Sequence, residues 1–375
     1  MATIGTNSGR GVGALGCTGS HVALLLVRRL AAAAMFAGLL TVAGPIARAE
    51  TCTTQSGMSE AERNGLADAA RNLALKVQAN DAAGLRAMTV DEVAKNFGGL
   101  QYLVAITAPK LAGGVAAVDQ IYLLDASSLQ RNPDGTAPDA QFFCSLNRST
   151  MEADFLIPAL PPGKYGFAMV NIAPAPGAGT TAAWRLSFLM RQEQGKWLLA
   201  GFYPKATTAA GHDGLWYWTQ ARQMVAAKQP WNAWLDYAAA QKLLQPADFV
   251  VSTHLDKLRT EAATAAPPAL SDGISIDAPL VVKGADGAEY HFTALTVDDS
   301  PDQSALDIAV HLHLDADAAG APADPAATRK RNDGAASALL AAYPEIRKPF
   351  HGVRVIAEAA GQPPMASEQP MAEIK

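Results

Sequence analysis

Apolar residues recur at helical spacing between residues 59 and 111. Ser59 and Glu62 have the S-x-x-E spacing of a capping box, which marks a helix start. The apolar positions that follow it are three or four residues apart: Leu66, Ala70, Leu73 and Val77. We therefore predict a long amphipathic helix from Ser59 to Asn80, a short helix over residues 82–88 and a third helix over residues 90–111.

After Val118 the pattern changes to the alternation of strands. Six stretches have it: VDQIYLLD, QFFCSL, EADFLIPAL, KYGFAMVNI, AWRLSFLMR and KWLLAGFYP. The last two meet at Gln194 and Gly195, which predicts a hairpin over residues 191–204.

Alternation along the last strand of this hairpin gives two apolar faces. One face would carry Trp197, Leu199 and Tyr203, and the other Leu198, Ala200 and Phe202. A strand that is apolar on both faces is typical of a sheet covered on both sides, so we expect a cover on the outer face as well.

The rest of the chain repeats the mixture of helices and strands. We predict helices over residues 212–230, 231–249 and 249–263, then strands over 274–282, 289–297, 305–314 and 350–358, with one helix over 335–343. These elements predict an α+β fold: a curved antiparallel sheet wrapped on helices, a helical hairpin, and a second, smaller α+β domain. The expected divisions are 1–49, 50–206, 207–266 and 270–375.

The first of these divisions has the features of a secretory signal peptide. It carries four arginines and no acidic residue, an apolar run LAAAAMFAGLLTVAG from Leu30, and a small-residue cleavage site at Ala47–Arg48–Ala49. A run of about 15 residues is shorter than the roughly 20 that a spanning helix needs. We expect export to the periplasm or the medium, with no membrane span after cleavage.

Export affects how the cysteines and the charge are interpreted. Cys17 is lost with the leader, and the remaining pair, Cys52 and Cys144, is expected to form a disulfide in an oxidising compartment. Loss of the four arginines lowers the basic count from 30 to 26 against 35 acidic residues, a formal charge of −9. A chain of this charge is a poor candidate for binding nucleic acid or anionic membrane.

A first helix ending in QANDAAGLRAMT, followed by strands that close in RQEQGKWLLAGFYP, resembles the nuclear-transport-factor-2-like (SnoaL-like, cystatin-like cone) superfamily over residues 58–205. The resemblance implies a curved sheet wrapped around the long helix, with a pocket inside the cone. Enzymatic members, such as ketosteroid isomerases and polyketide cyclases, place an aspartate or histidine base and a tyrosine donor there. The C-terminal part resembles no family that we can name.

No candidate for these roles lies in a motif that would transfer a catalytic function. The candidates among the acids and tyrosines of the matching region are Asp81, Tyr102, Asp119, Tyr122 and Asp125. The aromatic candidates for ligand binding are Tyr102, Tyr122, Trp184 and Trp197. Core packing against the long helix is the simpler explanation for the aromatic residues in the strands.

The stretch HLHLD raises the question of a metal. Alternation places His311, His313 and Asp315 on one face of a strand, where two imidazoles about 7 Å apart can share an ion. His291 or His351 could complete the site. A solvated outer face explains the same alternation and is favoured, so we expect no metal and no other cofactor.

After the predicted leader, the sequence contains no G-x-S-x-G elbow, no H-E-x-x-H and no glycine-rich phosphate loop. We therefore expect a non-catalytic binding or interaction module with an apolar, cone-shaped pocket. Its partner would be an apolar small molecule or a protein of the cell envelope. The alternative is a SnoaL-like cyclase, isomerase or hydratase that uses a buried Asp-Tyr pair.

Overall fold

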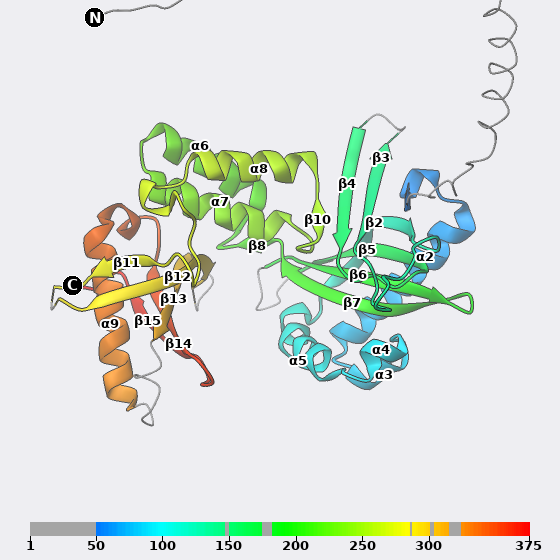
Figure 1. Cartoon of the computed structure of the whole chain (residues 1–375), viewed down its shortest axis with the longest axis horizontal. Helices are drawn as coiled ribbons and strands as arrows, with labels where there is room; N and C mark the ends of the chain where they lie inside the picture. The colour runs from blue at the N-terminus through cyan, green and yellow to red at the C-terminus, as the bar shows by residue number, and fades with distance from the viewer. Residues whose placement is uncertain (1–49, 147–149, 175–181, 286, 301–303, 315–323) are drawn as a thin grey trace, which may run out of the picture. The chain divides into compact units, whose positions relative to one another are not determined.

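The computed structural model describes residues 50–146, 150–174, 182–285, 287–300, 304–314 and 324–375 (Figure 1). The predicted signal peptide, residues 1–49, lies outside the described residues. Ala49–Lys375 form one compact unit. This unit contains both helices and antiparallel sheets, which confirms the predicted α+β class.

The predicted capping box begins the first long helix. The Ser59 hydroxyl accepts a hydrogen bond from the backbone N–H of Glu62 at 3.3 Å, and the Glu62 carboxylate accepts one from the backbone N–H of Ser59 at 3.0 Å. This helix is α2 (Glu60–Gln78), and the predicted short helix is α3 (Ala82–Ala87).

The prediction of one long third helix was wrong. The segment forms three short pieces instead: α4 (Asp91–Ala94), α5 (Gly98–Thr107) and the 3-10 helix η2 (Ala108–Leu111). The break lies directly before the glycine pair Gly98 and Gly99, which lose more backbone entropy in a helix than other residues.

The first sheet has five antiparallel strands. In spatial order they are β1 (Thr51–Thr54), β2 (Val115–Asp125), β5 (Lys164–Ala173), β6 (Trp184–Glu193) and β7 (Lys196–Ala206). The predicted turn between β6 and β7 has φ of 49° at Gln194 and 79° at Gly195, the positive values that a two-residue hairpin needs. Strand β1 was missed because TCTT has no apolar alternation.

One face of this sheet packs on α2, as Figure 1 shows. The helix contributes its fully buried stripe, Leu66, Ala70, Leu73, Ala74 and Val77. The sheet contributes Leu186, Phe188 and Met190 from β6, which alternate along the strand and lie on one face. Side chains therefore fill the space between the long helix and the sheet.

The predicted faces of β7 are correct only for its first half. Leu189 pairs with Gly201 but Met190 pairs with Leu199, so Ala200 is an extra residue in the strand. This β-bulge shifts the alternation, and Phe202 joins Leu199 in the core against α2 while Tyr203 packs on the opposite side.

A second, three-stranded sheet packs against the face of the first sheet that lies opposite α2. Its order is β10 (Val250–Val251), β4 (Thr150–Ile157) and β3 (Ala140–Leu146). Strand β10 lies in the segment predicted to begin the third helix of the middle region. That helix, α8 (Thr253–Thr264), starts only after Ser252, whose hydroxyl accepts a hydrogen bond from Leu255 N–H at 3.2 Å.

The predicted disulfide between Cys52 and Cys144 is present and joins β1 of the first sheet to β3 of the second.

The predicted helical pair is α6 (Gly214–Ala226) and α7 (Pro230–Leu244). These helices and α8 share one hydrophobic core with the C-terminal sheet. That sheet contains β11 (Leu280–Lys283), β12 (Glu289–Asp299), β13 (Leu306–Leu314), β14 (Gly352–Ala359) and β15 (Met365–Pro370). Helix α9 (Pro325–Ala342) connects β13 to β14, which are parallel; the other pairs are antiparallel.

The remaining short elements are η1 (Gln55–Gly57), β8 (Thr208–Ala209), β9 (His212–Asp213), η3 (Pro268–Leu270) and η5 (Pro344–Arg347).

Replacing both cysteines tests how much the disulfide stabilises the fold. Because it closes a separation of 92 residues, we expect Cys52→Ala with Cys144→Ala to lower the free energy of unfolding by about 3–5 kcal/mol. Urea unfolding measures this value. Reductant should lower the stability of the native chain by the same amount and leave that of the double variant unchanged; equal stability of the two oxidised chains would contradict the expectation.

Candidate functional site

Two acidic side chains lie at irregularities in neighbouring sheets. In the first sheet Val118 pairs with Val170 and Gln120 with Met169, so Asp119 is an extra residue in β2. In the second sheet the register shifts at Cys144 and Ser145, and Glu152 is the extra residue in β4. A β-bulge redirects a side chain, and bulges are common beside binding sites.

Both acids line the same cavity, which has a volume of about 480 Å³. Its polar lining is Asp119, Gln120, Tyr122, Glu152, Arg185, Ser252 and His254. Its apolar lining comes from the two sheets and from the segments around α6, α7 and α8, and includes Met169, Leu215, Trp218, Leu244, Val250 and Leu255. We call this cavity the bulge pocket.

Tyr122 is the buried donor of the bulge pocket. It is 3% exposed, and its hydroxyl lies 2.9 Å from Glu152 Oε1 and 3.1 Å from Gln120 Oε1. Burial, followed by the negative charge of Glu152, raises the pKa of Tyr122 above its ordinary value. The hydroxyl therefore stays protonated at neutral pH and can donate a hydrogen bond to a carboxylate or to a ligand.

Arg185 brings a cation to the same wall. One of its terminal nitrogens donates to the carbonyl of Leu244 at 3.2 Å, while Nε is buried and has no partner among the described residues. Burial lowers the pKa of this guanidinium and the charge of Asp119 acts in the opposite direction.

Two neighbours of Arg185 on the sheet also have unsatisfied polar atoms. Asn171 pairs with Arg185 across β5 and β6, and Ser187 is two residues further along β6. Asn171 Oδ1 and Ser187 Oγ are buried without a partner among the described residues. Buried polar groups in folded proteins are normally hydrogen-bonded, so such a cluster indicates a place where a ligand or water binds.

The structure brings some of the predicted site residues together and places the others elsewhere. Asp119 and Tyr122 come together in the bulge pocket. Asp81 caps α3 by accepting from Gly84 N–H at 2.8 Å, and it pairs with Lys76 at 2.6 Å, a hydrogen bond that lowers the pKa of Asp81. Tyr102 is 68% exposed on α5, and Asp125 ends β2 and accepts from Ser127 N–H at 2.9 Å.

The predicted ligand-binding tryptophans lie elsewhere. Trp197 is partly buried against the core that contains α2. Trp184 also packs there and lines a second cavity, described below. Neither lines the bulge pocket.

The histidine pair of β13 has the predicted alternation, with Val310, Leu312 and Leu314 in the core. His311 Nδ1 lies 2.9 Å from Glu358 Oε1, and His313 pairs across the sheet with His291. Asp315 lies outside the described residues. Within the part of the chain that the structure describes, no group of three or more His, Cys, Asp or Glu side chains is placed to hold a metal ion.

The chain matches no family model, no curated protein and no solved structure. No helix among the described residues combines the length and the apolar character needed to cross a membrane.

Sequence reasoning missed Glu152, Arg185 and Trp218 as members of the site. A signal was available for the first two: each is a charged residue in a mostly apolar strand, EADFLI and AWRLSFLM. Alternation could not place them, because the bulges that redirect Asp119 and Glu152 depend on the partner strands.

Another perturbed acid lies outside the bulge pocket. Asp236 on α7 is 6% exposed, and burial raises its pKa to about 7. Burial, followed by the charges of Asp236 and Asp299, raises the pKa of Tyr217 on α6. A strongly shifted pKa marks many functional groups, but Asp236 lines neither the bulge pocket nor the cavity beside Trp184, and we interpret it as a buried structural carboxyl.

The raised pKa of Asp236 makes the stability of the fold depend on pH. Between about pH 4 and pH 7 the folded chain holds a proton on Asp236 that the unfolded chain has lost, so this group lowers stability as the pH rises through that window. We expect Asp236→Asn to match the native chain near pH 4 and to be more stable at pH 8, by on the order of 3 kcal/mol. Urea unfolding at both pH values measures the difference. The exposed Asp272→Asn is the control, and a variant that lost stability equally at both pH values would contradict the interpretation.

Proposed function

We propose that the protein is an exported, non-catalytic binding module that holds a small ligand in the bulge pocket. The observation that carries this proposal is the placement of Asp119 and Glu152, on strands of two different sheets, at β-bulges that face one cavity. A strand gains no pairing energy from a bulge, so two of them at one cavity favour a role for the side chains that they redirect.

The chemistry of the lining indicates the kind of ligand. The polar side offers acceptors on Asp119 and Glu152, and donors on Tyr122 and Arg185. The opposite side offers the apolar surfaces of Leu215 and Trp218. A neutral ligand with several hydroxyl groups and one apolar face, such as a sugar, can satisfy both sides; a purely apolar ligand would leave the carboxylates and the guanidinium desolvated without partners.

The unsatisfied Nε of Arg185, which lines the pocket, supports a ligand rich in hydrogen-bonding groups. Asn171 and Ser187 lie next to Arg185 on β5 and β6, behind the lining of the pocket. In this proposal the partner is more polar than the apolar molecule expected from the sequence.

Export and family assignment remain part of the proposal. The disulfide between Cys52 and Cys144 supports an oxidising compartment, which agrees with the predicted signal peptide. The packing of α2 on an antiparallel sheet supports the nuclear-transport-factor-2-like assignment for residues 58–205.

A second candidate function is proton transfer of the cyclase, isomerase or hydratase kind. It is favoured by one observation, the hydrogen bond of 2.9 Å between Tyr122 and Glu152 in a cavity large enough for a substrate. This pair differs from the predicted Asp-Tyr pair in two ways. Its carboxylate belongs to a glutamate, and the pair lies on the face of the first sheet opposite α2.

Calorimetric titration with neutral sugars tests the first proposal. Glucose, N-acetylglucosamine and maltose are the probes, and octanol represents an apolar ligand. We expect at least one sugar to bind, and Asp119→Asn and Glu152→Gln each to weaken that binding by about tenfold, because each removes a charged acceptor. The controls are the exposed acids in Asp272→Asn and Glu60→Gln, which should bind as the native chain does.

The result that would overturn the proposal is binding of octanol but of no sugar, or sugar binding that neither pocket variant changes. Nuclear magnetic resonance of the bound sugar after incubation separates the two candidate functions. Recovery of unchanged sugar supports a binding module; conversion that Tyr122→Phe abolishes would support proton transfer instead.

A further inference from the structure

A second cavity of about 480 Å³ lies between β7, α7 and β12. Its lining includes Lys110, Trp184, Lys205, Lys242, Asp299 and Arg354. Hydrogen bonds connect the elements around it: Lys242 Nζ donates to the carbonyl of Val297 at 2.8 Å, and Ala210 N–H donates to Asp299 Oδ1 at 3.0 Å. We call it the lysine pocket.

The charge of the lysine pocket is opposite to that of the whole chain. Its lining carries four cationic side chains and two acidic ones, whereas the full sequence has a formal charge of −5. The two acids, Asp298 and Asp299, both lie at the end of β12. Two acids outside the lining, Glu368 and Asp248, pair with Arg354 and Lys205, so the positive charge open to an anion comes from Lys110 and from the weakly paired Lys205.

The cations on the β12 side are already paired. Lys242 forms an ion pair with Asp298, and Arg354 Nη2 lies 2.9 Å from Glu368 Oε2. Burial raises the pKa of Asp299, and the hydrogen bond from Ala210 N–H, followed by the positive charges of Lys242 and Lys110, acts against this rise. Lys110 and Asp299 both line the pocket.

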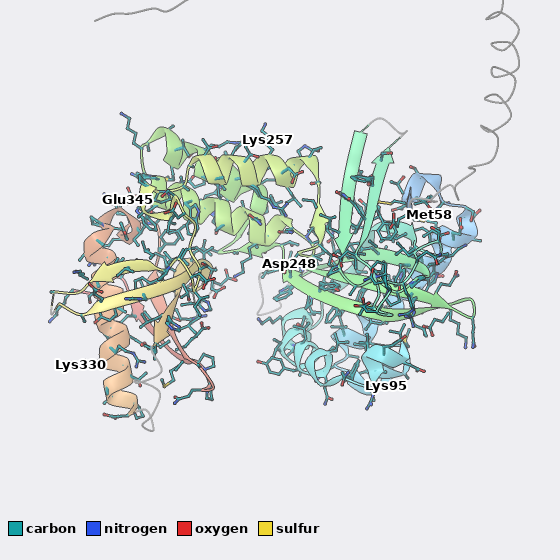
Figure 2. All side chains as sticks on the ribbon, viewed as in Figure 1. Met58, Lys95, Asp248, Lys257, Lys330 and Glu345 are labelled. Atoms are coloured by element: carbon teal, nitrogen blue, oxygen red, sulfur yellow. A yellow bond between two sulfur atoms is a disulfide. The ribbon has the colours of Figure 1, made fainter. Side chains whose placement is uncertain are left out.

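The two cations on the side of the first sheet, Lys110 and Lys205, are not held in strong ion pairs with described residues. Lys110 Nζ lies 5.2 Å from the centroid of the Trp184 ring, and it forms no ion pair with a described residue. Lys205 Nζ lies 3.0 Å from Asp248 Oδ1, but the Asp248 side chain is 95% exposed. Figure 2 labels Asp248. A pair with so exposed a partner is weak, so an incoming anion can compete for Lys205.

Apolar side chains complete the pocket between the two charged sides. Trp184 lies beside Lys110, and Leu243 and Leu306 contribute buried aliphatic surface. Inorganic anions would not use this surface. A ligand with an acidic group and a compact apolar or ring-shaped part would fill both parts of the pocket.

We propose that the lysine pocket binds a small organic anion, with its phosphate or carboxylate group between Lys110 and Lys205 and its apolar part against Trp184, Leu243 and Leu306. This site is separate from the bulge pocket, with which it has no lining residue in common. It adds a second ligand class to the protein.

Titration with phenyl phosphate and benzoate tests this proposal on the full mature chain. We expect at least one of them to bind, as measured by calorimetry. Lys110→Met with Lys205→Met should weaken the affinity by about tenfold or more, and raising the salt from about 0.05 to about 0.5 M should weaken it several-fold. Lys257→Met, at an exposed position labelled in Figure 2, is the matched control and should bind as the native chain does.

Three results would overturn the proposal. They are no binding of either anion, equal affinity for the neutral benzyl alcohol, and equal affinity for inorganic phosphate, which would show that the apolar wall plays no part. Circular dichroism of the double lysine variant confirms that it is folded. Asp119→Asn should leave anion binding unchanged, so failure of the bulge pocket proposal and failure of this one give different results.

Discussion

The constraint on which the structure depends is that both faces of the five-stranded sheet are apolar. On one face α2 buries its stripe of leucine, alanine and valine against β6 and β7. On the other face Phe167 and Leu189 need a second cover, which the β3–β4 hairpin and β10 provide. Because β10 follows α7 in the sequence, covering this face also brings the helical pair next to the first sheet.

This arrangement explains where the bulge pocket forms. Aromatic packing of Phe155 on Tyr122 and Phe167, with ring centroids 5.2 and 5.1 Å apart, fills the middle of the space between the two sheets. The bulges at Asp119 and Glu152 lie where the two sheets and the helical segments meet, and there the polar side chains line a cavity. The disulfide at Cys144 lies one strand away from Glu152, so it also restrains this part of the second sheet.

The helical pair contacts both the C-terminal sheet and the first sheet. Its buried residues, such as Trp218, Trp231 and Leu235, belong to the hydrophobic core of the C-terminal sheet. Leu244, at the end of α7, accepts a hydrogen bond from Arg185 of the first sheet. The three regions that the sequence suggested as separate therefore share side-chain contacts, and each of the two pockets draws its lining from more than one region.

The sequence by itself determined the α+β class, the capped first helix, the strands that follow it and the partners of the disulfide, because these depend on local periodicity, capping and the count of cysteines. It could not determine the faces of β7 beyond Ala200, the strand β10 or the positions of Asp119 and Glu152. Each of these depends on the register between strands, and a bulge of one residue reverses every side chain that follows it. The tertiary structure alone therefore decided which polar residues share a cavity.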